Sequence, residues 1–195
     1  MRKCVVFGIA LLAVLSLTLP SQASAQGVFL GAGATIPTGD YKDFGDGDGA
    51  KTGWVAEAGI SFPINENGLF IFADGLYGSN GHEYAGDKTD LLCGFGGVEL
   101  SFANEEGAGM FVFGELGFLR HAYKSDDFPE FEDSSTGLAF GAGVGYGIPL
   151  GDKLQGWVLG RYIQGQLSDD ETGEGNTTLF GVMAGLSIPI GGNGG

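Results

Sequence analysis

The sequence predicts an all-β fold, an eight-stranded antiparallel up-and-down transmembrane β-barrel that is preceded by a cleaved signal peptide. Three observations carry this prediction. Runs of about ten residues alternate between large apolar and small side chains, the pattern of a strand with two different faces. Glycine supplies 39 of the 195 residues, yet it alternates with apolar residues instead of forming low-complexity tracts. No segment after the N-terminal leader shows sustained helical periodicity.

The N-terminus has the three parts of a secretory signal. Residues 2–3 are positively charged, residues 4–19 are almost entirely apolar, and residues 23–25 supply the small-x-small pattern that signal peptidase reads. The apolar run is shorter than the roughly 20 residues that a membrane-spanning helix needs. We therefore expect cleavage between Ala25 and Gln26.

The remaining chain is long enough for one domain. We assign residues 1–25 to the signal peptide and residues 26–195 to a single β-barrel domain. This domain has one cysteine, Cys93, which we interpret as a packing residue and which excludes an intrachain disulfide. The formal net charge of −15 argues against nucleic-acid binding, because phosphate contacts need clustered Lys and Arg.

Eight alternating runs are interpreted as strands. They are residues 27–37, 53–63, 68–78, 90–102, 109–122, 136–149, 154–165 and 177–190. Most have one large apolar face and one face of glycines and isolated carboxylates, whereas in the third and fifth Phe70, Phe72, Phe111 and Phe113 put apolar residues on both faces near one end. A soluble sandwich also alternates, but its wet face carries many long polar side chains. The small second face found here suits the narrow lumen of an eight-stranded barrel, and the large apolar residues suit lipid.

The connections between these runs are of two kinds. Long acidic ones at 38–52, 78–90, 122–136 and 165–177 alternate with short ones at 63–67, 103–108 and 149–153. This alternation predicts extracellular loops at one end and periplasmic turns, with both termini, at the other. Aromatic residues near strand ends are consistent with interfacial girdles; they are Trp54, Tyr77, Tyr123, Tyr146, Trp157 and Tyr162.

Several segments resemble the outer-membrane β-barrel domain family, the small OmpA/OmpX-type barrels. They are residues 28–41, Gly53-Trp54, residues 137–146 with their Gly-x-Gly-x-Gly-Tyr ending, and Gly160-Arg161-Tyr162. The resemblance implies a monomer in the cell outer membrane of a Gram-negative bacterium. It also implies lipid and lipopolysaccharide as surroundings and the barrel-assembly machinery as a partner during insertion. Unlike many such barrels, the chain does not end on an aromatic residue.

Period-2 alternation places five charged residues in the lumen: Glu57, Asp74, Glu99, Glu115 and Arg161. Buried charges persist only when they are paired and hydrogen-bonded. We expect the carboxylates to cluster around the arginine as an interior plug that fixes strand register. The alternative is a proton- or cation-conducting lumen, which the small bore of eight strands disfavours. Four carboxylates against one arginine also require a proton or water on at least one of them.

The long loops hold most of the acid. The residues are Asp40, Asp43, Asp46, Asp48, Glu83, Asp87, Asp90, Asp126, Asp127, Glu130, Glu132, Asp133, Asp169, Asp170, Glu171 and Glu174. The favoured interpretation is a solvated surface that resists aggregation and is open to an extracellular ligand. Divalent-cation binding by Asp43, Asp46 and Asp48 is a weaker alternative, because no bidentate glutamate follows in a loop at the required spacing. We expect no cofactor.

Three functions stay open. We favour a non-enzymatic barrel with a structural or surface-interaction role. A lipid A-modifying enzyme would use His121 with Ser125, or His82, but nucleophilic catalysis needs serine, base and acid to converge in space, and the sequence does not establish this. An exported soluble, lipocalin-like binding protein is the third possibility, and the glycine-rich second face of the strands argues against it.

Overall fold

The computed structural model describes residues 26–42, 49–83, 86–104, 108–126, 133–151, 153–169 and 173–190. These residues form eight strands and a short 3-10 helix. The elements are β1 (Gln26–Thr38), η1 (Gly39–Tyr41), β2 (Gly53–Pro63), β3 (Leu69–Gly81), β4 (Lys88–Ala103), β5 (Gly109–Lys124), β6 (Asp133–Gly151), β7 (Leu154–Asp169) and β8 (Gly173–Ile190). β1 begins at Gln26, and the predicted signal peptide, with Ala25, lies outside the described residues.

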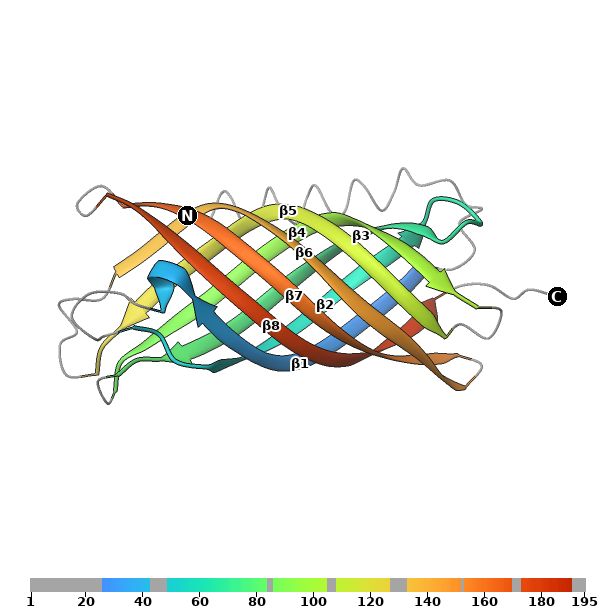
Figure 1. The fold of residues 1–195 in the computed structure, drawn as a ribbon, viewed down its shortest axis with the longest axis horizontal. Helices are drawn as coiled ribbons and strands as arrows, with labels where there is room; N and C mark the ends of the chain where they lie inside the picture. The colour runs from blue at the N-terminus through green and yellow to red at the C-terminus, as the bar shows by residue number, and fades with distance from the viewer. Residues whose placement is uncertain are drawn as a thin grey trace.

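The strands form one closed antiparallel barrel in which each strand pairs with its neighbours in sequence (Figure 1). β1 also pairs with β8, from Gln26 opposite Ile190 to Thr38 opposite Thr178. Closure leaves the sheet without a free edge, so the backbone groups of every strand find partners inside the barrel. The predicted eight-stranded up-and-down barrel is confirmed.

The barrel has two different ends. The loop end, on the left of Figure 1, carries the connections 39–52, 82–87, 125–132 and 170–172. The turn end, on the right, carries the connections 64–68, 104–108 and 152–153, together with the start of β1 and the end of β8. Gly68 adopts a φ of 80° in one of these tight turns, a conformation that glycine reaches without strain.

The loop-end connections are shorter than the sequence predicted, because the strands extend into them. β6 begins at Asp133, β7 continues to Asp169, and β8 begins at Gly173, so that residues 170–172 alone connect the last two strands. The acidic and polar residues assigned to loops therefore lie partly in paired strands. Strand pairing can continue into water, since the ladder satisfies the backbone there as well as in lipid.

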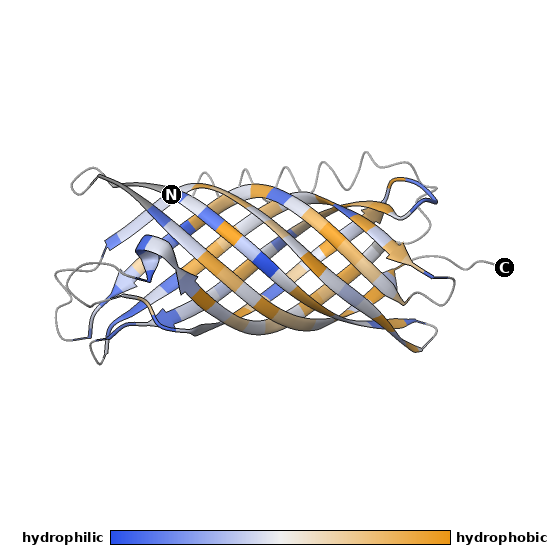
Figure 2. Cartoon of the chain, viewed as in Figure 1, coloured by the Kyte–Doolittle hydropathy of each residue, from blue (hydrophilic) through white to orange (hydrophobic). Residues whose placement is uncertain are grey.

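Large apolar side chains face outward around the barrel. Phe140, Val144 and Val182 are 43%, 46% and 54% exposed, and Leu186 is 38% exposed. Hydrophobic positions occupy the middle and the turn end of the barrel, whereas the loop end is mostly hydrophilic (Figure 2). A water-soluble protein does not expose so continuous an apolar surface, and this belt is the lipid-contacting surface of a membrane barrel. Among the described residues, no helix is long and apolar enough to cross a bilayer.

The interior is more apolar than the sequence predicted. Besides small residues, the lumen contains a buried core that includes Leu76, Leu91, Phe95, Leu119 and Leu179. Inward glycines make room for the large side chains of adjacent strands. The ring of Trp157, for example, occupies the space that a Cβ would take at Gly31 and Gly185.

Two of the six aromatic residues assigned to interfacial girdles belong to the interior. Trp157 is 7% exposed and packs in the core, and the hydroxyl of Tyr123 donates a 2.6 Å hydrogen bond to Asp87. Trp54 and Tyr77 do lie on the outer surface, where their rings meet edge to face. The girdle assignment of the two interior residues relied on position near a strand end alone, whereas alternation counted from the inward Glu115 and Arg161 places both of them inward.

The outward belt generates a prediction. Leu116 is 65% exposed near the middle of β5. We expect Leu116→Arg to lower the free energy of unfolding in lipid vesicles by about 2–4 kcal/mol, because the charge would meet hydrocarbon. The matched control is Leu150→Arg at the turn end of β6, where the expected loss is about 0–1 kcal/mol. Denaturant titration followed by tryptophan fluorescence measures both, and equal losses would contradict a belt centred on the mid-barrel.

Candidate functional site

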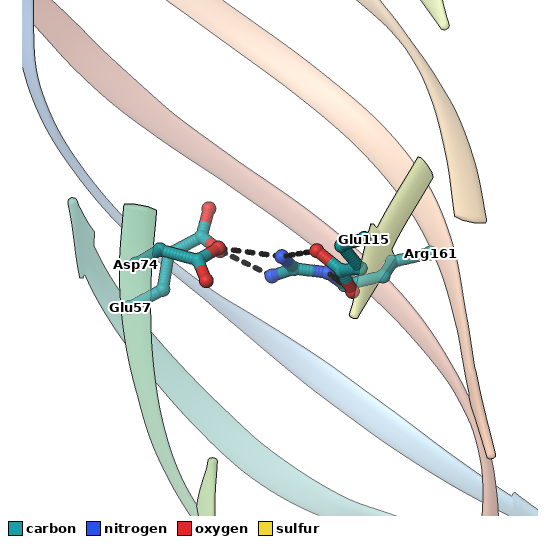
Figure 3. Close-up of polar contacts among 4 residues, drawn as sticks. All are labelled: Glu57, Asp74, Glu115 and Arg161. Carbon is teal, nitrogen blue, oxygen red and sulfur yellow. Dashed lines mark hydrogen bonds and ion pairs between the residues drawn. The ribbon is translucent and has the colours of Figure 1, made fainter. Parts of the chain in front are cut away.

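A single buried arginine lies at the centre of the lumen. Arg161, an inward position of β7, is 2% exposed and reaches three carboxylates on β2, β3 and β5 (Figure 3). Its Nη1 donates to Glu57 Oε2 at 2.6 Å, and its Nη2 donates to Asp74 Oδ2 at 2.5 Å. Its Nε donates to Glu115 Oε1 at 2.9 Å, and Nη2 also bonds Glu115 Oε2, so this carboxylate is held at both oxygens. We call these four residues the arginine cluster.

The walls of the lumen hold the arginine cluster in place. The guanidinium carbon of Arg161 lies 5.6 Å from the ring centroid of Phe95 and 5.3 Å from that of Phe113, within the range of cation–π attraction. Gly141 on β6 leaves the space that the Glu115 carboxylate occupies. Planar guanidinium geometry suits such multidentate pairing, which a lysine could not reproduce.

The arginine cluster carries more carboxylates than positive charges. Asp74 Oδ1 is buried and has no hydrogen-bond partner among the described residues. One guanidinium cannot neutralise three carboxylates, so the excess needs either a bound proton or water.

Glu99 faces the lumen but does not join the arginine cluster. On β4 it lies opposite Phe70 and Phe113, whereas Glu115 lies opposite Gly97. This shift of two residues moves Glu99 about 6–7 Å along the strand toward the turn end, because a strand rises about 3.3 Å per residue. The sequence-based grouping of Glu99 with Arg161 therefore needs correction.

Between the arginine cluster and the loop end the lumen is packed. Leu76, Leu91, Cys93, Ile163 and Met183 belong to the core there. The cavity that they help to line measures only about 20 Å³, room for about one water molecule. This half of the described lumen is therefore filled mainly by side chains.

A layer of buried polar side chains lies between this apolar layer and the loop end. Asn80 Nδ2 donates to Thr35 Oγ1 at 3.0 Å and to the carbonyl of Lys51 at 2.7 Å. Thr89 Oγ1 lies 2.7 Å from His82 Nε2 and 3.3 Å from His121 Nε2. Asn80 and Thr89 are fully buried, so these bonds replace the water that their polar groups lose. The sequence analysis missed this layer, although the period-2 alternation of β3 and β4 places both residues inward.

The proposed catalytic residues are not arranged as a nucleophile and its base. The ring nitrogens of His121 face threonine hydroxyls, with Nδ1 lying 3.2 Å from Thr177 Oγ1. Ser125 bonds Asp87 instead, and hydrogen bonds from Tyr123 and Ser125 hold the pKa of Asp87 below its usual range. Ser125, Thr89 and Thr177 are all buried, so substrate does not reach these hydroxyls in the described structure.

The weak metal candidates Asp43, Asp46 and Asp48 lie outside the described residues. Within the described ranges, no group of three or more His, Cys, Asp or Glu side chains is arranged to hold a metal ion.

The lipid-facing belt and the narrow lumen with its buried arginine cluster define a small outer-membrane-type β-barrel. Comparison with known families agrees: residues 9–187 match the family described as "Outer membrane protein beta-barrel domain", and the chain belongs to this family. It is a protein of the outer membrane. A search of the curated proteins found no match.

Solved structures share the fold at low sequence identity. Neisserial surface protein A (NspA) superposes with a TM-score of 0.65 at 14% identity, over 85% of this chain and 97% of that one. Ail, the attachment invasion locus protein of Yersinia pestis, superposes with a TM-score of 0.55 at 17% identity, over 86% of this chain and 99% of that one. Both likenesses concern the fold alone.

The arginine cluster generates a prediction about stability. Arg161→Leu removes the one cation among three buried carboxylates, and we expect it to cost about 3–5 kcal/mol of folding free energy. The folded barrel should then convert to its unfolded gel mobility at a lower temperature. The matched control is Arg120→Leu, an exposed arginine on β5, with an expected change below about 1 kcal/mol. If the Arg161 variant unfolds at the same temperature as the unsubstituted protein, the arginine cluster does not stabilise the barrel.

Proposed function

We propose that the protein is a non-enzymatic, non-conducting outer-membrane barrel that acts through its surface at the loop end. The observation that carries this proposal is the closed lumen. The arginine cluster fills the middle of the described lumen, and the apolar layer on its loop-end side fills the space beyond it. A barrel without a pore or an accessible nucleophile has its outer wall and its ends as surfaces for function.

Charge favours the loop end as the working surface. Many of the 24 acidic residues of the chain lie there, including Asp40, Asp126 and Asp133, which are exposed. Basic residues compensate only some of them, as where Lys51 lies 3.3 Å from Glu83 and Lys124 lies 2.6 Å from Asp90. A surface of this sign attracts cationic partners and repels polyanions.

The acidic loop end of this chain differs from what a sulfated ligand would need. The similar barrel Ail has been solved in complex with such a ligand, the heparin analogue sucrose octasulfate. A sulfated ligand needs an excess of cations, whereas acidic residues outnumber basic ones in the loop-end segments of this chain. We infer that a partner here is positively charged, such as a basic peptide or protein surface. The outward belt supports contact with lipid and lipopolysaccharide, and insertion by the barrel-assembly machinery as a monomer completes the proposal.

The closed lumen predicts an absence of conductance. Purified, refolded protein in a planar lipid bilayer should give no stepwise current in potassium chloride, since ions would have to cross the packed layer around Leu91 and Leu119. An open porin reconstituted in the same way is the positive control. Reproducible current steps from the folded protein, absent from a heat-denatured sample, would contradict a closed barrel.

The proposed orientation predicts which end is labelled on intact cells. Glu83→Cys places a thiol at the exposed loop end, and Asn67→Cys places one at the exposed turn end. A membrane-impermeant maleimide should label the first variant on intact cells and the second only after lysis. The native Cys93 is buried, so the unsubstituted protein is the background control. The reverse pattern would turn the barrel over and overturn the proposed role of the acidic loops.

A further inference from the structure

The turn-end half of the lumen is hollow, in contrast to the packed loop-end half. A cavity of about 410 Å³ extends from the arginine cluster to the turn end, where Ala103, Lys153 and Pro189 line it. We call this cavity the vestibule. Its volume falls in the range of about 300–1,000 Å³ that small-molecule sites occupy.

Aromatic rings form much of the vestibule wall. The rings are those of Phe29, Phe70, Phe72, Phe111, Phe113 and Trp157. Phe72 and Phe113 meet edge to face at 5.9 Å, and Phe113 stacks with Phe111 at 6.4 Å. Aromatic faces carry partial negative charge, so such a wall attracts organic cations as well as apolar groups.

One carboxylate in the vestibule wall stays unpaired. Glu99 is partly buried, and it has no hydrogen-bond or ion-pair partner among the described residues. Arg161 cannot serve it, because its guanidinium is already bonded to Glu57, Asp74 and Glu115. Lys153, also in the lining, is exposed and forms no ion pair with a described residue. An acid within an apolar wall is stabilised when a cation pairs with it.

We propose that the vestibule binds a small organic cation with an apolar body, an alkylammonium or arylammonium compound. Its ammonium group pairs with Glu99, and its body packs against the aromatic rings. The ligand enters from the turn end, because the arginine cluster closes the other side. The inference concerns this cavity alone and does not depend on the proposed partner at the loop end.

The structure supplies its own reporter for the test. The chain has two tryptophans, Trp157 in the vestibule wall and Trp54 on the outer surface. In a Trp54→Phe background, the emission of Trp157 alone reports on the vestibule. Detergent would compete for the site, so the protein is placed in phosphatidylcholine nanodiscs and titrated with benzyltrimethylammonium chloride. We expect a saturable change in emission. The affinities for sodium benzoate and benzyl alcohol should be at least tenfold weaker.

Variants separate specific binding from partition into lipid. Glu99→Gln should weaken the affinity for benzyltrimethylammonium at least tenfold, whereas Glu66→Gln, at an exposed position in a turn, should leave it unchanged. Ser101→Phe, which fills the vestibule, should abolish saturation and provides the test if the Glu99 variant fails the heat-dependent gel shift for folding. Equal affinities in the two glutamine variants, saturation that survives Ser101→Phe, or equal binding of benzoate would each overturn the proposal.

Discussion

In hydrocarbon, every backbone N–H and C=O must find a partner inside the protein, and the pairing of β1 with β8 meets that demand for the whole sheet. Closure with eight strands then fixes much else. It sets a narrow lumen, it makes successive side chains point alternately to lipid and to the axis, and it limits the volume available inside. The outward apolar belt and the inward glycines are both consequences of this closed ladder.

The filling of the lumen is uneven along its axis. Toward the loop end, aliphatic side chains and a layer of buried polar residues close it. At mid-height, Arg161 bonds carboxylates from β2, β3 and β5 and so links strands that are far apart in sequence. Because a slip of one residue in any of these strands would turn a charge toward lipid, the arginine cluster favours a single register. Toward the turn end the same barrel stays open.

The period-2 alternation was sufficient to predict the barrel and the inward direction of Glu57, Asp74, Glu115 and Arg161. It could not predict which charges meet, since that depends on the stagger between strands, and the stagger separates Glu99 from the arginine cluster by one inward step. The assignment of Trp157 to a girdle relied on its place near a strand end, although the alternation that turns Arg161 inward also turns Trp157, four residues earlier, toward the lumen. The extension of β6, β7 and β8 beyond the predicted ends depends on pairing with a neighbour, which a single strand's composition does not encode.

The fit between inward glycines and large neighbours couples positions on adjacent strands. Glu115 occupies the space beside Gly141, and Trp157 that beside Gly31 and Gly185. A bulkier residue at one member of such a pair is compatible with the barrel only if its partner shrinks, since the wall cannot move outward without breaking the ladder. Divergent or redesigned versions of this chain should therefore exchange interior volume in compensated pairs across a strand boundary, while lipid-facing positions drift one at a time.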